Sequence, residues 1–175
     1  MQKGMRGCLA GCLGLLLIGC AAYVFIDCGG PLTVPVRPMA TVAPTAVAET
    51  PVEAYLRDAR QIQWNVGLEL VALGKLLQNP DLDDGLWRDQ VDAAITVARL
   101  WAERAPTLAP VPPEMAAIHA ELAAGCSFVE AAMDHLESAL LDLDEAELAA
   151  CEAAMDSANA HFTAYRALLA AYQGQ

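Results

Sequence analysis

The sequence predicts an all-α protein, in which an antiparallel, up-down-up-down four-helix bundle follows an N-terminal membrane anchor and a stalk rich in Pro, Thr and Ala. Four segments after residue 50 place apolar residues three and four positions apart, the spacing of helices that bury one face. Strand patterns are absent there, and short connections favour antiparallel neighbours. The predicted units are an anchor or lipoprotein signal over 1–27, a linker over 28–50 and an exported bundle over 51–175.

The anchor is an uncharged stretch over residues 8–26, CLAGCLGLLLIGCAAYVFI, preceded by Lys3 and Arg6. Its nineteen residues rise about 28 Å as a helix, close to the roughly 30 Å hydrocarbon core of a bilayer. The basic flank and Asp27 on the other side predict that the N-terminus stays in the cytoplasm and that the rest is exported. We therefore expect a cell-membrane protein with an extracytoplasmic C-terminal domain.

The same stretch supports a second interpretation, a lipoprotein signal. Residues 17–20, Leu-Ile-Gly-Cys, match a bacterial lipobox, in which Cys20 is lipidated and becomes the mature N-terminus. A short basic region and an apolar region precede it, as a signal peptide requires. The apolar residues that continue from Ala21 to Ile26 favour an uncleaved span instead. Simple secretion is the third alternative.

The linker over residues 28–50 consists largely of Pro, Thr, Ala and Val. Its prolines, at positions 31, 35, 38 and 44, prevent helix formation and most sheet pairing. A polyproline-like chain extends up to about 3.1 Å per residue. This segment is therefore predicted to be a stalk that holds the bundle away from the bilayer.

The first helix is predicted over 52–78 and ends before Pro80, because the residue before a proline disfavours the helical conformation. Its apolar face consists of Leu56, Ala59, Ile62, Val66, Leu70, Leu73 and Leu77. The second helix is predicted over 85–104. Its apolar face consists of Trp87, Val91, Ala94, Ala98 and Trp101.

Residues 105–113 contain four prolines and are predicted to form a loop, after which the third helix runs to residue 140. The third apolar face consists of Met115, Ile118, Leu122, Cys126, Val129, Met133, Leu136 and Leu140. The fourth helix follows Asp144, for which the sequence predicts a capping box with Glu147. Its apolar face consists of Leu148, Cys151, Met155, Ala158, Phe162, Tyr165, Leu169 and Tyr172.

Acidic residues dominate the exported domain. Residues 51–175 carry 7 Arg and Lys against 20 Asp and Glu, a net charge of −13. Such a domain repels the phosphates of nucleic acids and anionic lipid headgroups, so neither is expected as a partner. Residues 51–105 have 6 cations and 9 acids, whereas residues 106–175 have 1 cation and 11 acids.

The sequence holds no haem-attachment, di-metal, phosphate-loop or nucleophile-elbow motif, so we predict no enzymatic activity and no cofactor. His119 and His161 fall at the edges of their apolar faces, about five residues apart in height, so a joint metal site requires the helices to slide. His135 is predicted to face solvent. Cys126 and Cys151 differ in height by about 12 Å, which predicts two free thiols rather than a disulfide.

Acidic side chains gather where the antiparallel order brings the 79–84 and 141–144 connections together, at the end far from the stalk. The candidate ligands for a divalent cation such as calcium are Asp81, Asp83, Asp84 and Asp142. In the alternative interpretation, these acids cap helix N-termini and interact with the helix dipoles.

A second candidate site consists of Trp64, Leu68 and Val71, which lie one turn apart on the first helix, roughly opposite its main apolar face. They form either an exposed contact site for a protein partner or part of a wide buried face. Together these features predict a binding or interaction module of the bacterial cell envelope. The alternative is an extracytoplasmic domain that senses a ligand or binds a divalent cation and works with a separate membrane partner.

Overall fold

A computed structural model of the protein describes residues 48–174; the predicted anchor over 8–26, Cys20 and most of the stalk lie outside the described residues. The described part contains no strand, which confirms the all-α prediction there. None of its helices combines the length and the apolar character that crossing a bilayer requires. Its helices are α2 (Pro51–Gln78), α3 (Gly85–Ala102), the 3₁₀ helix η1 (Pro113–Met115), α4 (Ala116–Asp142) and α5 (Glu145–Gln173).

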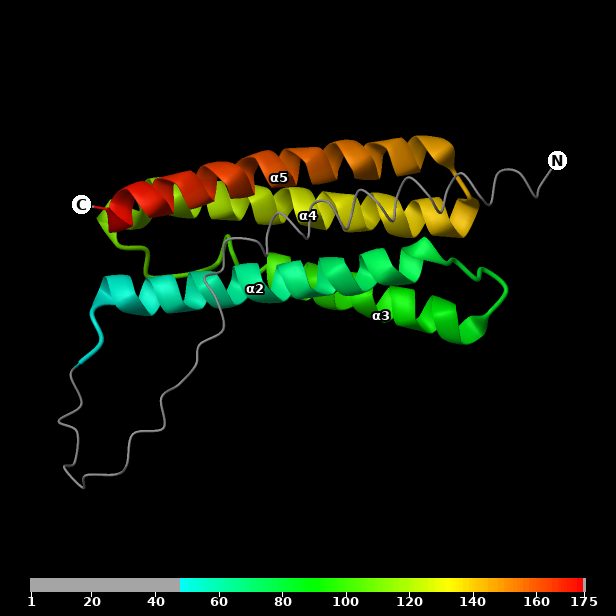
Figure 1. Cartoon of the computed structure of the whole chain (residues 1–175), viewed down its shortest axis with the longest axis horizontal. Coiled ribbons are helices and arrows are strands. Elements are labelled where there is room, and N and C mark those ends of the chain that lie inside the picture. Colours follow the sequence, from blue (N-terminus) through cyan, green and yellow to red (C-terminus); the bar gives the residue numbers. More distant parts are fainter. Residues whose placement is uncertain (1–47, 175) are drawn as a thin grey trace, which may run out of the picture.

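The four α-helices lie along one long axis, and consecutive helices run in opposite directions (Figure 1). α2 packs on α3, α3 on α4, and α4 on α5, so that the α2–α3 hairpin lies along the α4–α5 hairpin. The start of α2 and the end of α5 lie at the same end of the molecule. The two acidic connections lie at the opposite end, which we call the distal tip and define as residues 79–84 and 141–147.

A complete capping box starts α2. The Thr50 hydroxyl accepts a hydrogen bond from the Glu53 backbone N–H (3.2 Å), and the Glu53 carboxylate accepts one from the Thr50 backbone N–H (2.8 Å). Pro51 lies in the first turn, where backbone N–H groups have no acceptor within the helix, so the missing N–H of proline costs no hydrogen bond. The helix ends two residues before Pro80, as the sequence predicted.

Asp84 caps α3, because its carboxylate accepts a hydrogen bond from the Leu86 backbone N–H (3.0 Å). The helix ends at Ala102, two residues before its predicted end. Beyond it the chain turns, and the Ala105 backbone N–H donates to the Ala102 carbonyl (3.0 Å). The early end fits the proline-rich loop that follows, since Pro106 disfavours a helical conformation at the residue before it.

α4 extends two residues beyond its predicted end, to Asp142, and Leu143 terminates it. Leu143 adopts the left-handed conformation, with φ 54° and ψ 41°. Among the described residues it is the one non-glycine residue with positive φ. Glycine or asparagine usually occupies such a position, because a Cβ atom is disfavoured there. The leucine is therefore a local exception that periodicity does not reveal.

The start of α5 differs in part from the prediction. Asp144 is the N-cap, and its carboxylate accepts a hydrogen bond from the Ala146 backbone N–H (2.8 Å). The capping box with Glu147 is not formed, because Oε2 of Glu147 lies 2.7 Å from Nδ1 of His135 on α4. The His135 side chain keeps 40% of its surface accessible and also contacts Glu147 of α5, so the prediction that it faces solvent holds only in part.

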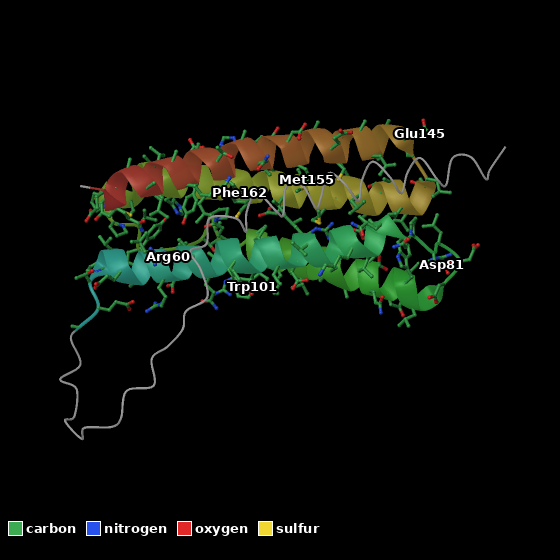
Figure 2. All side chains as sticks on the ribbon, viewed as in Figure 1. Arg60, Asp81, Trp101, Glu145, Met155 and Phe162 are labelled. Carbon is green, nitrogen blue, oxygen red and sulfur yellow. The ribbon has the colours of Figure 1, made fainter. Side chains whose placement is uncertain are left out.

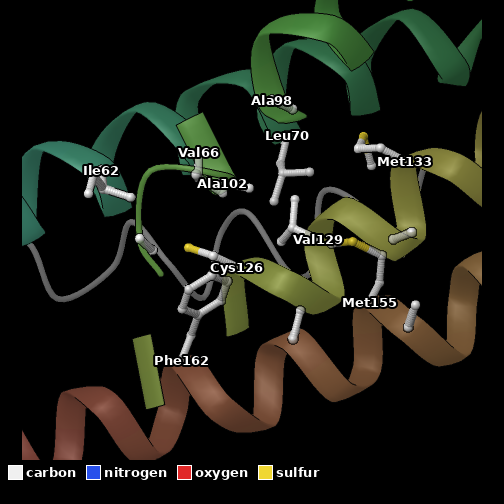
Figure 3. Close-up of a cluster of buried hydrophobic side chains, with 14 of the residues drawn as sticks. Ile62, Val66, Leu70, Ala98, Ala102, Cys126, Val129, Met133, Met155 and Phe162 are labelled. Atoms are coloured by element: carbon white, nitrogen blue, oxygen red, sulfur yellow. The ribbon is translucent and has the colours of Figure 1, made fainter. Parts of the chain in front are cut away.

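A hydrophobic core lies between the two hairpins, and all four α-helices contribute to it (Figure 3). The four predicted apolar faces are confirmed. Cys126 and Cys151 are buried free thiols, as the sequence predicted. Some predicted core residues are only partly buried, and these lie at the margins of the core: Leu56, Trp101, Leu140, Leu148, Leu169 and Tyr172.

Candidate functional site

The predicted apolar site on α2 is exposed at two of its three positions. Trp64 keeps 47% and Leu68 keeps 45% of its surface accessible, whereas Val71 is partly buried. The opposite face of the same helix carries the core residues Ile62, Val66 and Leu70. The alternative interpretation, a wide buried face, is therefore wrong for Trp64 and Leu68.

A groove between α2 and α3 continues this apolar face. It has a volume of about 410 Å³ and is lined by Leu68, Val71, Ala72, Lys75, Leu76 and Gln90. Leu68 and Val71 thus form both the ridge on α2 and one wall of the groove. The charged group in the lining is the Lys75 ammonium, and no carboxylate is among the lining residues.

Further apolar surface lies near the end of α3. Leu100 is 58% exposed, and Trp101 is partly buried. The guanidinium carbon of Arg104 lies 4.5 Å from the centroid of a Trp101 ring, a cation–π arrangement. Tryptophan is enriched at protein interfaces because it combines a large apolar body with a polar N–H group.

At the distal tip the four candidate metal ligands have separate surroundings. Asp84 is engaged as the α3 cap, and its backbone N–H donates to the Asp81 carbonyl (3.0 Å). Asp83 and Asp142 are exposed. Figure 2 shows Asp81 and Glu145 from the two connections at this same end. Within residues 48–174, no group of three or more His, Cys, Asp or Glu side chains could hold a metal ion.

The two histidines of the alternative metal site have different partners. Nδ1 of His161 lies 2.7 Å from Oε2 of Glu121, and its ring stacks on Phe128 with centroids 5.5 Å apart. The ring of His119 packs edge-on against Tyr55, 6.0 Å away. Burial lowers the pKa of His119 and raises the pKa of Tyr55 to about 12. The structure therefore uses these histidines in helix packing.

Sequence reasoning missed the exposed leucines of the distal tip and its surroundings. Leu141 is 77% exposed, Leu143 42% and Leu86 64%. Each of these leucines is next in the sequence to a core or cap residue. The spacing of apolar residues identifies that neighbour but gives no signal for the leucine itself. The available signal was that Leu141 and Leu143 fall outside the apolar face that ends at Leu140.

Ion pairs link α3 of the first hairpin to α4 of the second. The Arg99 guanidinium lies 2.7 Å from carboxylate oxygens of both Asp134 and Glu137 on α4. Burial raises the pKa of nearby Glu130, and the carboxylates of Glu103 and Asp134 raise it further. The two ion pairs of Arg99 hold α3 to α4.

Comparison with known proteins adds no family to these observations. A scan against protein-family models found no match, and neither did searches of curated proteins and of solved structures.

Proposed function

We propose that the protein is a membrane-anchored, extracytoplasmic module of the bacterial cell envelope that binds another protein through the exposed apolar face of α2. In this proposal the four helices form an up-down-up-down bundle. Residues 8–26, or a lipid on Cys20, hold it at the membrane, and the stalk over 28–50 spaces it from the bilayer. The support for the anchor is the uncharged stretch with its basic flank.

The observation that carries the binding role is the exposure of Trp64 and Leu68 on a helix whose other face is buried. Single exposed apolar residues are normal on any protein surface. Here they are one turn apart, and Leu68 continues into the groove beside Val71 and Leu76. A tryptophan beside an apolar groove is the kind of side chain that dominates binding energy in protein interfaces.

Site-specific photo-cross-linking tests this proposal. A photoreactive amino acid replaces Leu68 in the full chain, which is produced in its own bacterium and irradiated in intact cells. We expect one defined protein adduct, and Trp64→Ala in the same chain should remove it, because the tryptophan anchors the contact. Adding Trp64→Ala should leave the amount of protein and its thermal midpoint unchanged.

The matched control places the same photoreactive residue at Leu168, an exposed position on α5. No adduct at residue 68, or the same adducts at residues 68 and 168, would remove the support for a binding face on α2. The anchor is tested separately by mass spectrometry of the mature protein. A mature chain that begins at Met1 supports the span, and one that begins at an acylated Cys20 supports the lipoprotein.

A further inference from the structure

A second pocket lies at the distal tip, where the two hairpins meet. Its volume is about 340 Å³, within the lower range of ligand and anchor-residue sites. The 79–84 connection, α3, and the end of α4 with Leu143 supply its walls. Its apolar lining consists of Leu82, Trp87, Val91, Leu140, Leu141 and Leu143.

The walls of this pocket are fixed in different ways. Trp87 is almost fully buried, and its indole N–H donates to the Leu76 carbonyl (3.1 Å), so the pocket floor belongs to the core. Nε of Arg88 donates to the Leu82 carbonyl (2.7 Å), which holds the 79–84 connection against α3. The remaining wall is apolar surface in contact with water, because Leu141 is 77% exposed and Leu143 is 42% exposed.

The charged groups around the pocket are mostly negative. Asp83, Asp92 and Glu137 line it, and the one cation among the lining residues is Arg88. The lining therefore carries three acidic side chains and one basic side chain, a net negative charge. The rest of the tip adds further carboxylates, which are those of Asp81, Asp84, Asp142, Asp144, Glu145 and Glu147.

We propose that the distal tip is a second interaction surface, which binds a basic amphipathic segment of a partner protein. An apolar side chain of that segment enters the pocket against Leu141 and Leu143. Lysine or arginine side chains next to it lie against the Asp83 and Asp92 carboxylates. The complementary charge orients the partner segment and speeds its association with the tip. Burial of the leucine side chains provides most of the binding affinity.

The surroundings argue against other occupants. A second copy of the tip would bring two acidic surfaces together, and an anionic lipid surface would be repelled in the same way. Within residues 48–174, the carboxylates of the tip belong to no group of three or more side chains that could hold a metal ion. This site shares none of its lining residues with the α2 face around Trp64 and Leu68, so the two proposals succeed or fail independently.

Methyl NMR on the full chain, in neutral-detergent micelles and with labelled leucines, tests the proposal. The probe is the capped pentapeptide Lys-Leu-Trp-Leu-Lys at millimolar concentrations, and the matched control is Glu-Leu-Trp-Leu-Glu. We expect the basic peptide to shift the methyl signals of Leu82, Leu141 and Leu143 and to leave that of Leu68 unchanged. The acidic peptide should shift none of them.

Charge variants provide the second arm. Asp83→Asn with Asp92→Asn should weaken binding of the basic peptide about fivefold, as expected for surface ion pairs worth about 1 kcal/mol in total. Glu152→Gln with Asp156→Asn removes the same charge from exposed positions on α5 and should leave the affinity unchanged. Absence of shifts, equal shifts with both peptides, or equal weakening by both double variants would overturn the proposal.

Discussion

Gly125 of α4 lies against the ring of Phe162 of α5 so closely that a Cβ atom at residue 125 would come within 2.9 Å of Cε1 of the phenylalanine. Both residues are buried, and the ring lies between α4 and α5 in the core (Figure 3). A glycine at this point lets the two helices approach. The contact therefore sets the spacing of the hairpin with the larger net negative charge.

The first prediction follows from this contact. Gly125→Ala should lower the free energy of unfolding by about 1–3 kcal/mol, because the added methyl group overpacks the core against an aromatic ring. Gly85→Ala is the matched control, since a Cβ there would meet nothing within 4 Å. Chemical denaturation of both variants checks the prediction, and equal stabilities would show that α4 and α5 can move apart at no cost.

The second prediction concerns the two thiols of the described domain. Burial raises the pKa of Cys126 and of Cys151 to about 12, so almost no reactive thiolate exists at neutral pH. Neither thiol should react with a maleimide reagent in the folded protein, and both should react after unfolding. Mass spectrometry of the labelled protein checks this. A disulfide between them, or rapid labelling of the native protein, would contradict the buried helix faces.

The third prediction concerns acid stability. Burial lowers the pKa of His119 below its ordinary value of about 6.5, so the unfolded chain takes up this proton more readily than the folded protein does. The contribution of His119 to stability is therefore full above this value and is lost as the pH falls towards the lowered pKa. His119→Gln should gain stability relative to the parent chain between about pH 7 and about pH 5. If the free energies of unfolding of the two chains change with pH by the same amount, the assignment to His119 is refuted.

The fourth prediction concerns calcium. Millimolar calcium should leave the thermal midpoint unchanged, because no three suitable ligands lie together within residues 48–174 and Asp84 already caps α3. The chain with both Asp83→Asn and Asp142→Asn should behave identically. A calcium-dependent rise in the midpoint that this double variant abolishes would restore the metal interpretation of the tip, since only the folded state would assemble such a site.

Much of the fold could be predicted from the sequence because its signals are local. The spacing of core residues such as Ile62 and Val66 identifies one face of α2 without knowledge of the other helices. The helix ends near Pro80 and Asp84 follow from backbone chemistry, and the predicted bounds were right within two residues. The different heights of Cys126 and Cys151 along the bundle likewise predicted that both thiols are free.

What could not be predicted depends on the rotation and packing of one helix against another. Glu147 was expected to cap its own helix, but it lies against His135, because α5 packs along α4. The pair of His161 and Glu121 joins residues 40 positions apart in the same way. Leu143 follows a different rule, since its left-handed conformation at the end of α4 has no signal in the apolar pattern.

The central claim, that the exposed face of α2 binds a protein, is tested most directly by the native mass of the chain extracted from its own cells. Extracts in mild detergent are separated on a native gel and probed for the full chain, its Trp64→Ser and Leu68→Ser double variant, and a Leu168→Ser control. We predict a complex larger than the chain alone, which persists in the control and, in the double variant, is absent or reduced to a smaller complex held by the distal tip, although that variant remains folded. Migration of the parent chain as a bare monomer, or an intact complex in the double variant, would contradict the account.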